Sequence, residues 1–96
     1  MRRDEALAII RAHEPELREL GVATLELFGS VARDEAGPQS DVDLMVQFDR
    51  SVDLFHFIGL KLKLEEWLGC EVDLVSRRAV KRQLRERIFA EAIRAA

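Results

Sequence analysis

The sequence lacks the features that stabilise secreted proteins or anchor membrane proteins. It contains a single cysteine, Cys70, so no internal disulfide can form, and the spacing of that cysteine fits no metal-binding motif. Uninterrupted apolar runs are only a few residues long, and the charged first residues include no basic region followed by an apolar one. These absences exclude a membrane-spanning or secretory segment from the sequence and predict a reducing, cytoplasmic location.

Charge is divided unevenly along the chain, although the net charge is only −3. Residues 1–75 hold 8 basic and 16 acidic side chains, whereas residues 76–96 hold 7 basic and 2 acidic ones. An acidic body is a poor surface for phosphate backbones, so we expect no direct nucleic-acid binding. The basic segment has two interpretations: a solvated helix face, or a surface that docks an acidic or RNA-bearing partner.

The length of 96 residues predicts one domain, spanning 1–96, with a single core. It leaves no room for a separate substrate-binding domain, so another chain must hold any macromolecular acceptor. No repeat, low-complexity tract or linker is present.

Hydrophobic periodicity predicts the order helix, strand, short helix, strand, helix, strand, helix. The predicted elements are residues 4–20, 24–28, 30–35, 43–48, 53–68, 71–75 and 76–94. This order indicates a small α/β (α+β) fold, with a mixed sheet of three or slightly more strands and helices covering one face.

Several details of these elements are predicted as well. Pro15 indicates a break near His13 in the first helix, and Ser30 and Ser76 are expected as N-caps. The helix over residues 53–68 is expected to be largely buried. The last helix is expected to bury one stripe, formed by Val80, Leu84, Ile88 and Phe89.

Three aspartates open two of the predicted strands. Asp41 and Asp43 lie two positions apart, so their side chains point the same way, with Cα atoms about 6.6 Å apart. Asp73 takes the same place in the next strand. Carboxylate oxygens are the ligands that Mg²⁺ prefers, and a pair of metal ions can stabilise both the attacking and the leaving oxygen of a phosphoryl group. Asp41, Asp43 and Asp73 are therefore candidate metal ligands and catalytic residues.

A Gly-Ser turn beside these aspartates predicts a phosphate-binding element. Gly29 lets the backbone approach a phosphate because it has no Cβ, and Ser30 offers a hydroxyl donor to the β- and γ-phosphates. Arg33, one helical turn further on, has a guanidinium that matches two phosphate oxygens. The alternative for Arg33 is an ion pair with an acidic neighbour: Asp34, Glu35 or Asp41.

The segments Gly29-Ser30, Ala32-Arg33, Ser40-Asp41-Val42-Asp43-Leu44 and Val72-Asp73-Leu74-Val75 resemble the signature of the polymerase-β-like nucleotidyltransferases. The short chain, with Val52-Asp53-Leu54-Phe55 leading into Leu60-Lys61-Leu62, resembles the minimal nucleotidyltransferases, which are antitoxins that pair with HEPN-domain toxins. The resemblance runs from about Leu25 to the C-terminus. One position departs from it: the family often has glycine after Ala-Arg, where this chain has Asp34.

The resemblance implies a Mg²⁺-dependent enzyme with two metal ions. It would transfer AMP from ATP to a hydroxyl of a HEPN toxin, with tyrosine as the expected acceptor, in a hetero-oligomer of the two proteins. The main role implied for Asp73 is that of a ligand of the metal nearer the acceptor, and its secondary role is that of a base. Because the chain has no tyrosine, it cannot modify itself at that residue. One alternative is a non-catalytic antitoxin that occludes its toxin. Another is transfer to an antibiotic or a tRNA end, but such relatives carry extra acceptor domains.

Overall fold

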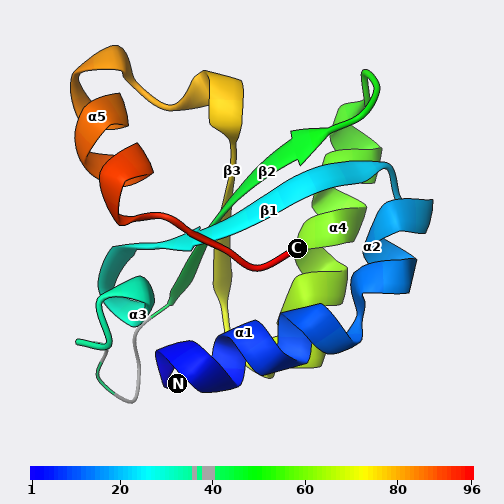
Figure 1. Ribbon diagram of the computed structural model, residues 1–96. Helices are drawn as coiled ribbons and strands as arrows, with labels where there is room; N and C mark the ends of the chain where they lie inside the picture. The colour runs from blue at the N-terminus through cyan, green and yellow to red at the C-terminus, as the bar shows by residue number, and fades with distance from the viewer. Residues whose placement is uncertain (36, 38–40) are drawn as a thin grey trace.

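The central feature of the computed structural model is a four-stranded sheet with the strand order β3-β2-β1-β4 (Figure 1). The structure describes residues 1–35, 37 and 41–96. Strands β2 and β3 are parallel, whereas β1 is antiparallel to both β2 and β4. In chain order the elements are α1 (Arg3–Ala12), α2 (Glu14–Glu19), β1 (Val22–Phe28), α3 (Gly29–Ala32), β2 (Val42–Phe48), α4 (Leu54–Leu68), β3 (Val72–Ser76), the 3₁₀ turn η1 (Arg77–Ala79), α5 (Arg82–Glu91) and β4 (Ile93–Arg94).

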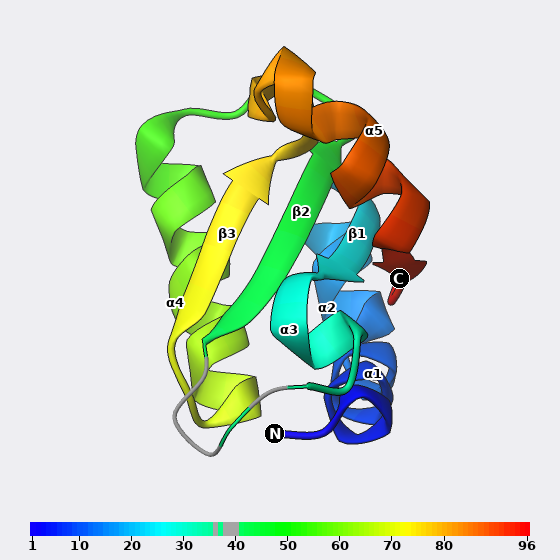
Figure 2. The ribbon, with the colours of Figure 1, turned by 90° about the vertical axis from the view of Figure 1, so that its left-hand side faces the viewer.

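Helices α1, α2 and α4 cover one face of the sheet, and α3 and α5 lie on the other side (Figures 1 and 2). The alternation along each strand explains this layering, because successive side chains point to opposite faces. The covered face is apolar, as predicted: Leu25, Leu27, Val42, Leu44, Val46, Val72 and Leu74 are all buried. On the other face, the same strands present Glu26, Asp43 and Asp73.

The predicted break in the N-terminal helix is confirmed. Helix α1 ends at Ala12, and α2 starts at Glu14 with Pro15 in its first turn, where a missing N–H costs nothing. His13, at the break, stacks on Trp67 with ring centroids 4.0 Å apart. Gly21 then adopts a φ of +83° before β1, the conformation that glycine accepts most readily after a helix.

Helix α4 is less buried than the sequence predicts. Asp53 caps its N-terminus by accepting a hydrogen bond from the His56 N–H at 2.8 Å, and Gly69 ends it with a φ of +71°. Leu60, Leu64 and Leu68 form its buried stripe. The expectation that the helix is largely buried was wrong, because the body of the protein covers only one side of it. Four large apolar side chains lie exposed on α4: Leu54, Phe55, Ile58 and Leu62.

The C-terminal segment also differs from the prediction. Instead of one helix starting at Ser76, the chain forms η1, then α5, then strand β4, and the Ser76 side chain caps nothing. Helix α5 has no fully buried residue, and Leu84, expected in its buried stripe, is 43% exposed. Strand β4 pairs with β1 at Glu26↔Arg94 and Leu27↔Ile93. The local pattern predicted a helix here, but pairing with a distant strand decides the conformation.

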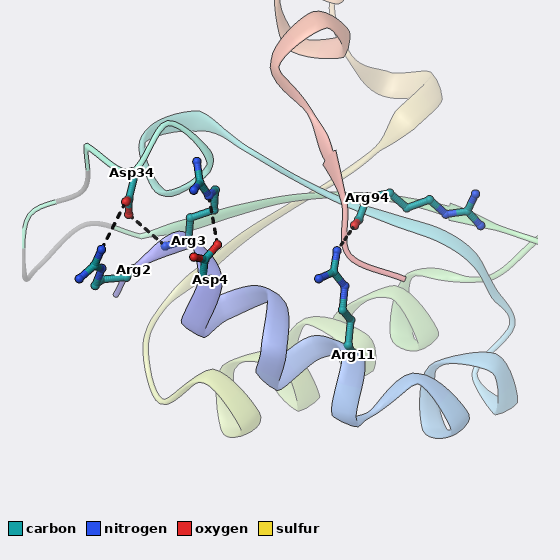
Figure 3. A network of polar contacts seen from close by, with 6 residues as sticks. All are labelled: Arg2, Arg3, Asp4, Arg11, Asp34 and Arg94. Atoms are coloured by element: carbon teal, nitrogen blue, oxygen red, sulfur yellow. Dashed lines mark hydrogen bonds and ion pairs between the residues drawn. The ribbon is translucent and has the colours of Figure 1, made fainter.

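Polar contacts tie the N-terminal helix to two distant segments (Figure 3). The Arg3 backbone N–H donates to Asp34 Oδ1 at 3.2 Å, and the Arg2 guanidinium lies 3.8 Å from Asp34 Oδ2. The Arg11 guanidinium donates to the carbonyl of Arg94 at 3.1 Å. These contacts join α1 to the turn after α3 and to strand β4.

Ser40, which is part of the family signature, lies outside the described part of the chain. Among the described residues, no helix has the length and apolar character needed to cross a membrane.

Candidate active site

The two strands that carry the predicted carboxylates lie side by side and in register. Asp43 of β2 is paired with Asp73 of β3, so the two side chains leave the same face of the sheet. Asp41 lies just before β2 and is exposed. The structure therefore brings together the three aspartates that the sequence pointed out, at the ends of β2 and β3 where these strands begin.

The three aspartates bring negative charges close together. The pKa of Asp43 is raised to about 6, chiefly by burial of its carboxyl, and further by the charges of Asp73 and Asp41 and a hydrogen bond with Asp73. A divalent cation would offset this repulsion, and carboxylate oxygens are suitable ligands for Mg²⁺. Among the described residues, no group of three or more aspartate, glutamate, histidine or cysteine side chains is arranged so that it could hold a metal ion. The donor chemistry fits Mg²⁺, and the side chains must adjust to hold it.

The Gly-Ser turn adjoins these carboxylates directly. Phe28, the last residue of β1, is paired with Asp43, so the next residue, Gly29, meets the Asp43 side chain. Gly29 has a φ of +75°, and a Cβ placed on it would overlap the Asp43 carboxylate and lie 3.0 Å from its Cγ. Glycine is required here for both reasons. Ser30 lies within α3 and is not its N-cap as expected, because the helix already begins at Gly29.

Arg33 follows α3 and is held by two acidic side chains. Its Nε lies 3.0 Å from Glu35 Oε2, and its terminal nitrogen lies 2.9 Å from Glu91 Oε2. The hydrogen bonds that Arg33 donates to Glu35 and to Glu91 raise the pKa of Arg33 above its ordinary value. Of the neighbours expected to pair with Arg33, Glu35 does so.

Asp34 explains the departure from the family pattern. It is the one non-glycine residue with positive φ in the described part of the chain, at +59°. Aspartate tolerates this left-handed conformation better than most residues, and glycine adopts it freely. The glycine that the family often has here therefore corresponds to a requirement for positive φ. In this chain the Asp34 carboxylate accepts a hydrogen bond from the Arg3 N–H and pairs with the Arg2 guanidinium (Figure 3).

Sequence reasoning missed Glu91. Its carboxylate accepts a hydrogen bond from the Gly29 N–H at 3.2 Å and another from Arg33 at 2.9 Å. Glu91 lies in the segment that was considered only for its basic charge. No local signal marks it, since the contact depends on the β4 pairing that returns the chain to β1.

A basic cleft of about 400 Å³ lies at the other end of β2 and β3. Four arginines contribute to its lining: Arg50, Arg77, Arg78 and Arg85. Arg77 lies 3.2 Å from Glu26 Oε1 and 4.3 Å from the centre of the Phe89 ring. None of the three aspartates lines this cleft, so the cleft is distinct from the candidate active site.

Comparison with known proteins agrees with this geometry. Residues 10–96 match the nucleotidyltransferase domain family. Protein adenylyltransferase MntA of Thermococcus cleftensis is 40% identical over 91 residues, which cover 94% of this chain and 92% of that protein. A solved structure described as a candidate minimal nucleotidyltransferase superposes with a TM-score of 0.83 at 40% identity, covering 97% of this chain and 95% of that one.

A more distant likeness shows the fold alone. The structure of a tri-AMPylated Shewanella oneidensis HEPN toxin in complex with its MNT antitoxin includes a chain with a TM-score of 0.66 and 22% identity, covering 94% of this chain and 71% of that one. Together with the family match over most of the sequence, the fold and the grouped aspartates lead to one conclusion. The chain belongs to the nucleotidyltransferase family, as one of its minimal members.

Proposed function

We propose that this nucleotidyltransferase transfers AMP from ATP to a tyrosine hydroxyl on a HEPN-domain toxin, and so acts as its antitoxin. One observation carries the proposal: the Gly29 turn lies directly against Asp43, which is paired in register with Asp73. A phosphate-binding turn beside paired carboxylates is the arrangement that nucleotidyl transfer needs.

The reaction is an in-line displacement at the α-phosphorus. The acceptor hydroxyl oxygen forms a bond to the α-phosphorus, the bond from the α-phosphorus to the oxygen leading to the β-phosphate breaks, and pyrophosphate leaves. Asp41, Asp43 and Asp73 would hold two Mg²⁺ ions, which supply charge stabilisation to the attacking and leaving oxygens when bound. Asp73 would also receive the hydroxyl proton, as its second role.

The residues of the turn would bind the leaving group. The Gly29 N–H, the Ser30 hydroxyl and the Arg33 guanidinium offer donors on one side of Asp43. Such donors suit the β- and γ-phosphates, because charge-assisted hydrogen bonds to phosphate are stronger than neutral ones.

The partner is proposed from the relatives and from the surface of α4. The related MntA protein is named a protein adenylyltransferase, and the Shewanella complex contains an AMPylated HEPN toxin. Phe55 is 86% exposed and Leu62 is 57% exposed on one side of α4, and exposed apolar clusters of this kind mark protein interfaces. We therefore expect a cytoplasmic hetero-oligomer in which the toxin supplies the acceptor.

The proposal is tested by incubating the chain with Mg²⁺, α-labelled ATP and the HEPN protein encoded beside it. We expect label on the partner and none on this chain, which contains no tyrosine. Asp43→Asn should abolish labelling. Absence of label from the partner, with both proteins folded and associated, would overturn the proposal.

A second candidate is an antitoxin that acts only by occlusion. The observation that favours it is the engagement of Gly29 and Arg33 by Glu91, which leaves the phosphate-binding donors occupied. The double variant Asp41→Asn, Asp43→Asn distinguishes the two. If it still neutralises the toxin in cells, occlusion is sufficient; if neutralisation is lost while binding persists, transfer is required.

A further inference from the structure

The carboxylate of Glu91 accepts hydrogen bonds from two groups that, under the proposed function, bind the triphosphate. Its Oε1 accepts from the Gly29 N–H at 3.2 Å, and its Oε2 accepts from the Arg33 guanidinium at 2.9 Å. These contacts span 62 and 58 residues of sequence. One side chain therefore joins the end of α5 to two of the three donors proposed to bind phosphate, Gly29 and Arg33.

The fold holds Glu91 in this place. Helix α5 ends at Glu91, and two residues later β4 begins to pair with β1, where Ile93 lies opposite Leu27. Leu27 is only two residues before Gly29, so the pairing fixes the last turn of α5 beside the start of α3. The Glu91 side chain is 21% exposed, which shows that it is largely enclosed rather than free on the surface.

A carboxylate and a phosphate present the same chemistry to these donors. Both are anionic and offer oxygen acceptors to a backbone N–H and to a guanidinium. The single Gly29 N–H cannot donate well to Glu91 and to a phosphate oxygen at once. The negative charge of Glu91 would also repel a triphosphate placed beside it, as would Asp43 on the other side of Gly29 in the absence of metal.

We propose that Glu91 is a positioning residue that acts as an internal competitor of the nucleotide: it holds Gly29 and Arg33 in the nucleotide-free protein and must leave when a triphosphate binds. The inference rests on the proposed function, since it requires that Gly29 and Arg33 bind the triphosphate. Nucleotide binding then frees the end of α5 from α3. The site and the basic C-terminal helix are linked through this one side chain.

The test compares Glu91→Gln with the matched variant Glu86→Gln. Both remove one negative charge from α5, but Glu86 is exposed and makes no ion pair with any described residue. Binding of the ATP analogue AMP-PNP with Mg²⁺ is measured by calorimetry. We expect Glu91→Gln to bind roughly two- to tenfold more tightly than wild type, the range expected for losing one partly exposed charged contact, and Glu86→Gln to be unchanged. In turnover, KM for ATP should fall while kcat is kept.

A second measurement uses the wild-type protein and does not depend on a variant that folds. The amide ¹⁵N–¹H resonance of Gly29 is followed while tripolyphosphate is added, and the Glu91 side-chain carboxyl resonance is followed in the same titration. We expect both to move together, since one acceptor replaces the other. A Gly29 shift with an unmoved Glu91 carboxyl would overturn the inference.

The outcomes separate the inference from the proposed function. If wild type binds AMP-PNP and Glu91→Gln binds it equally or more weakly, competition is wrong and the proposed function stands. If Glu91→Gln binds AMP-PNP and wild type does not, competition between Glu91 and the nucleotide is supported. If neither protein binds AMP-PNP with Mg²⁺, the proposed function fails, and the inference fails with it.

Discussion

Gly29 and Asp43 are in direct contact: the Asp43 carboxylate fills the space where a side chain on Gly29 would lie. This contact joins the turn proposed to bind phosphate to the strand proposed to carry metal ligands. Gly29→Ala should therefore destabilise the fold by about 1–3 kcal/mol, through its positive φ and the overlap, and should weaken AMP-PNP binding at least tenfold.

Gly69→Ala is the matched control for Gly29→Ala. Gly69 has a similar φ of +71°, but a Cβ there meets nothing within 4 Å. It should lose about 1 kcal/mol of stability from the backbone alone, with unchanged nucleotide binding. Equal losses of binding in the two variants would show that contact with Asp43 is irrelevant.

The raised pKa of Asp43 makes stability depend on pH. A carboxyl whose pKa rises from 3.8 to about 6 on folding favours the folded state while protonated, and this stability is lost as pH rises through 6. Without divalent cations, Asp43→Asn should gain about 1–2 kcal/mol over wild type at pH 8, after allowance for solvent screening, and nothing at pH 3. Unfolding by denaturant at both pH values measures this.

Asp49→Asn serves as a control of opposite sign for the pH experiment. A hydrogen bond from Arg50 lowers the pKa of Asp49, so this carboxylate contributes stability above its unfolded pKa that is lost as pH falls. Asp49→Asn should not gain stability at pH 8. A gain of the same size in both variants would mean that general charge reduction, and not the crowding of Asp43 with Asp73 and Asp41, is responsible.

The basic C-terminal segment is expected to bind the partner through charge. Arg85 donates to the carbonyls of Val80 and Arg78, so it is left intact. Reversal of Arg78, Lys81 and Arg82 to Glu should slow association with the partner roughly 10- to 1,000-fold at low salt, and the effect should shrink as salt is added. AMP-PNP affinity should hold. Stopped-flow association measures the first quantity, and a rate equal to wild type at every salt concentration would return this segment to a solvated helix face.

The exposed apolar side of α4 yields a separate prediction. The double variant Phe55→Ser, Leu62→Ser should weaken partner binding at least tenfold, because buried aromatic and aliphatic side chains dominate interface energies, while stability and AMP-PNP binding hold. The free energy of unfolding and the AMP-PNP affinity of the double variant are its controls, since neither depends on the exposed side of α4. Partner binding that is unaffected by the α4 variant would exclude this side of the helix from the interface.

Local pattern was enough to predict the elements of the sheet that build the site. Successive side chains of a strand point to opposite faces of the sheet, so Asp43 and Leu44 lie on different faces, as do Asp73 and Leu74. The structure agrees, because Leu44 and Leu74 are buried and Asp43 is paired with Asp73. Pro15 marked the break in the first helical segment, because its restriction of the backbone acts locally.

What local pattern could not predict depends on distant contacts. Strand β4 exists only because residues 93–94 meet β1, and Glu91 reaches Gly29 only because of that pairing. Likewise, the composition of α4 shows that it is apolar, but only the packed structure shows that Phe55 and Leu62 face away from the core. Glu91 lies at the proposed nucleotide site, and Phe55 and Leu62 lie at the proposed interface.

The most direct test of the account follows which phosphate of ATP reaches the partner. Parallel reactions contain Mg²⁺, this chain, the HEPN protein encoded beside it, and ATP labelled at either the α- or the γ-phosphate. We expect label on the partner from α-labelled ATP only, release of γ-label as pyrophosphate, and loss of both signals in the Asp41→Asn, Asp43→Asn variant. Transfer of γ-label, or α-label transfer that survives in that variant, would contradict it.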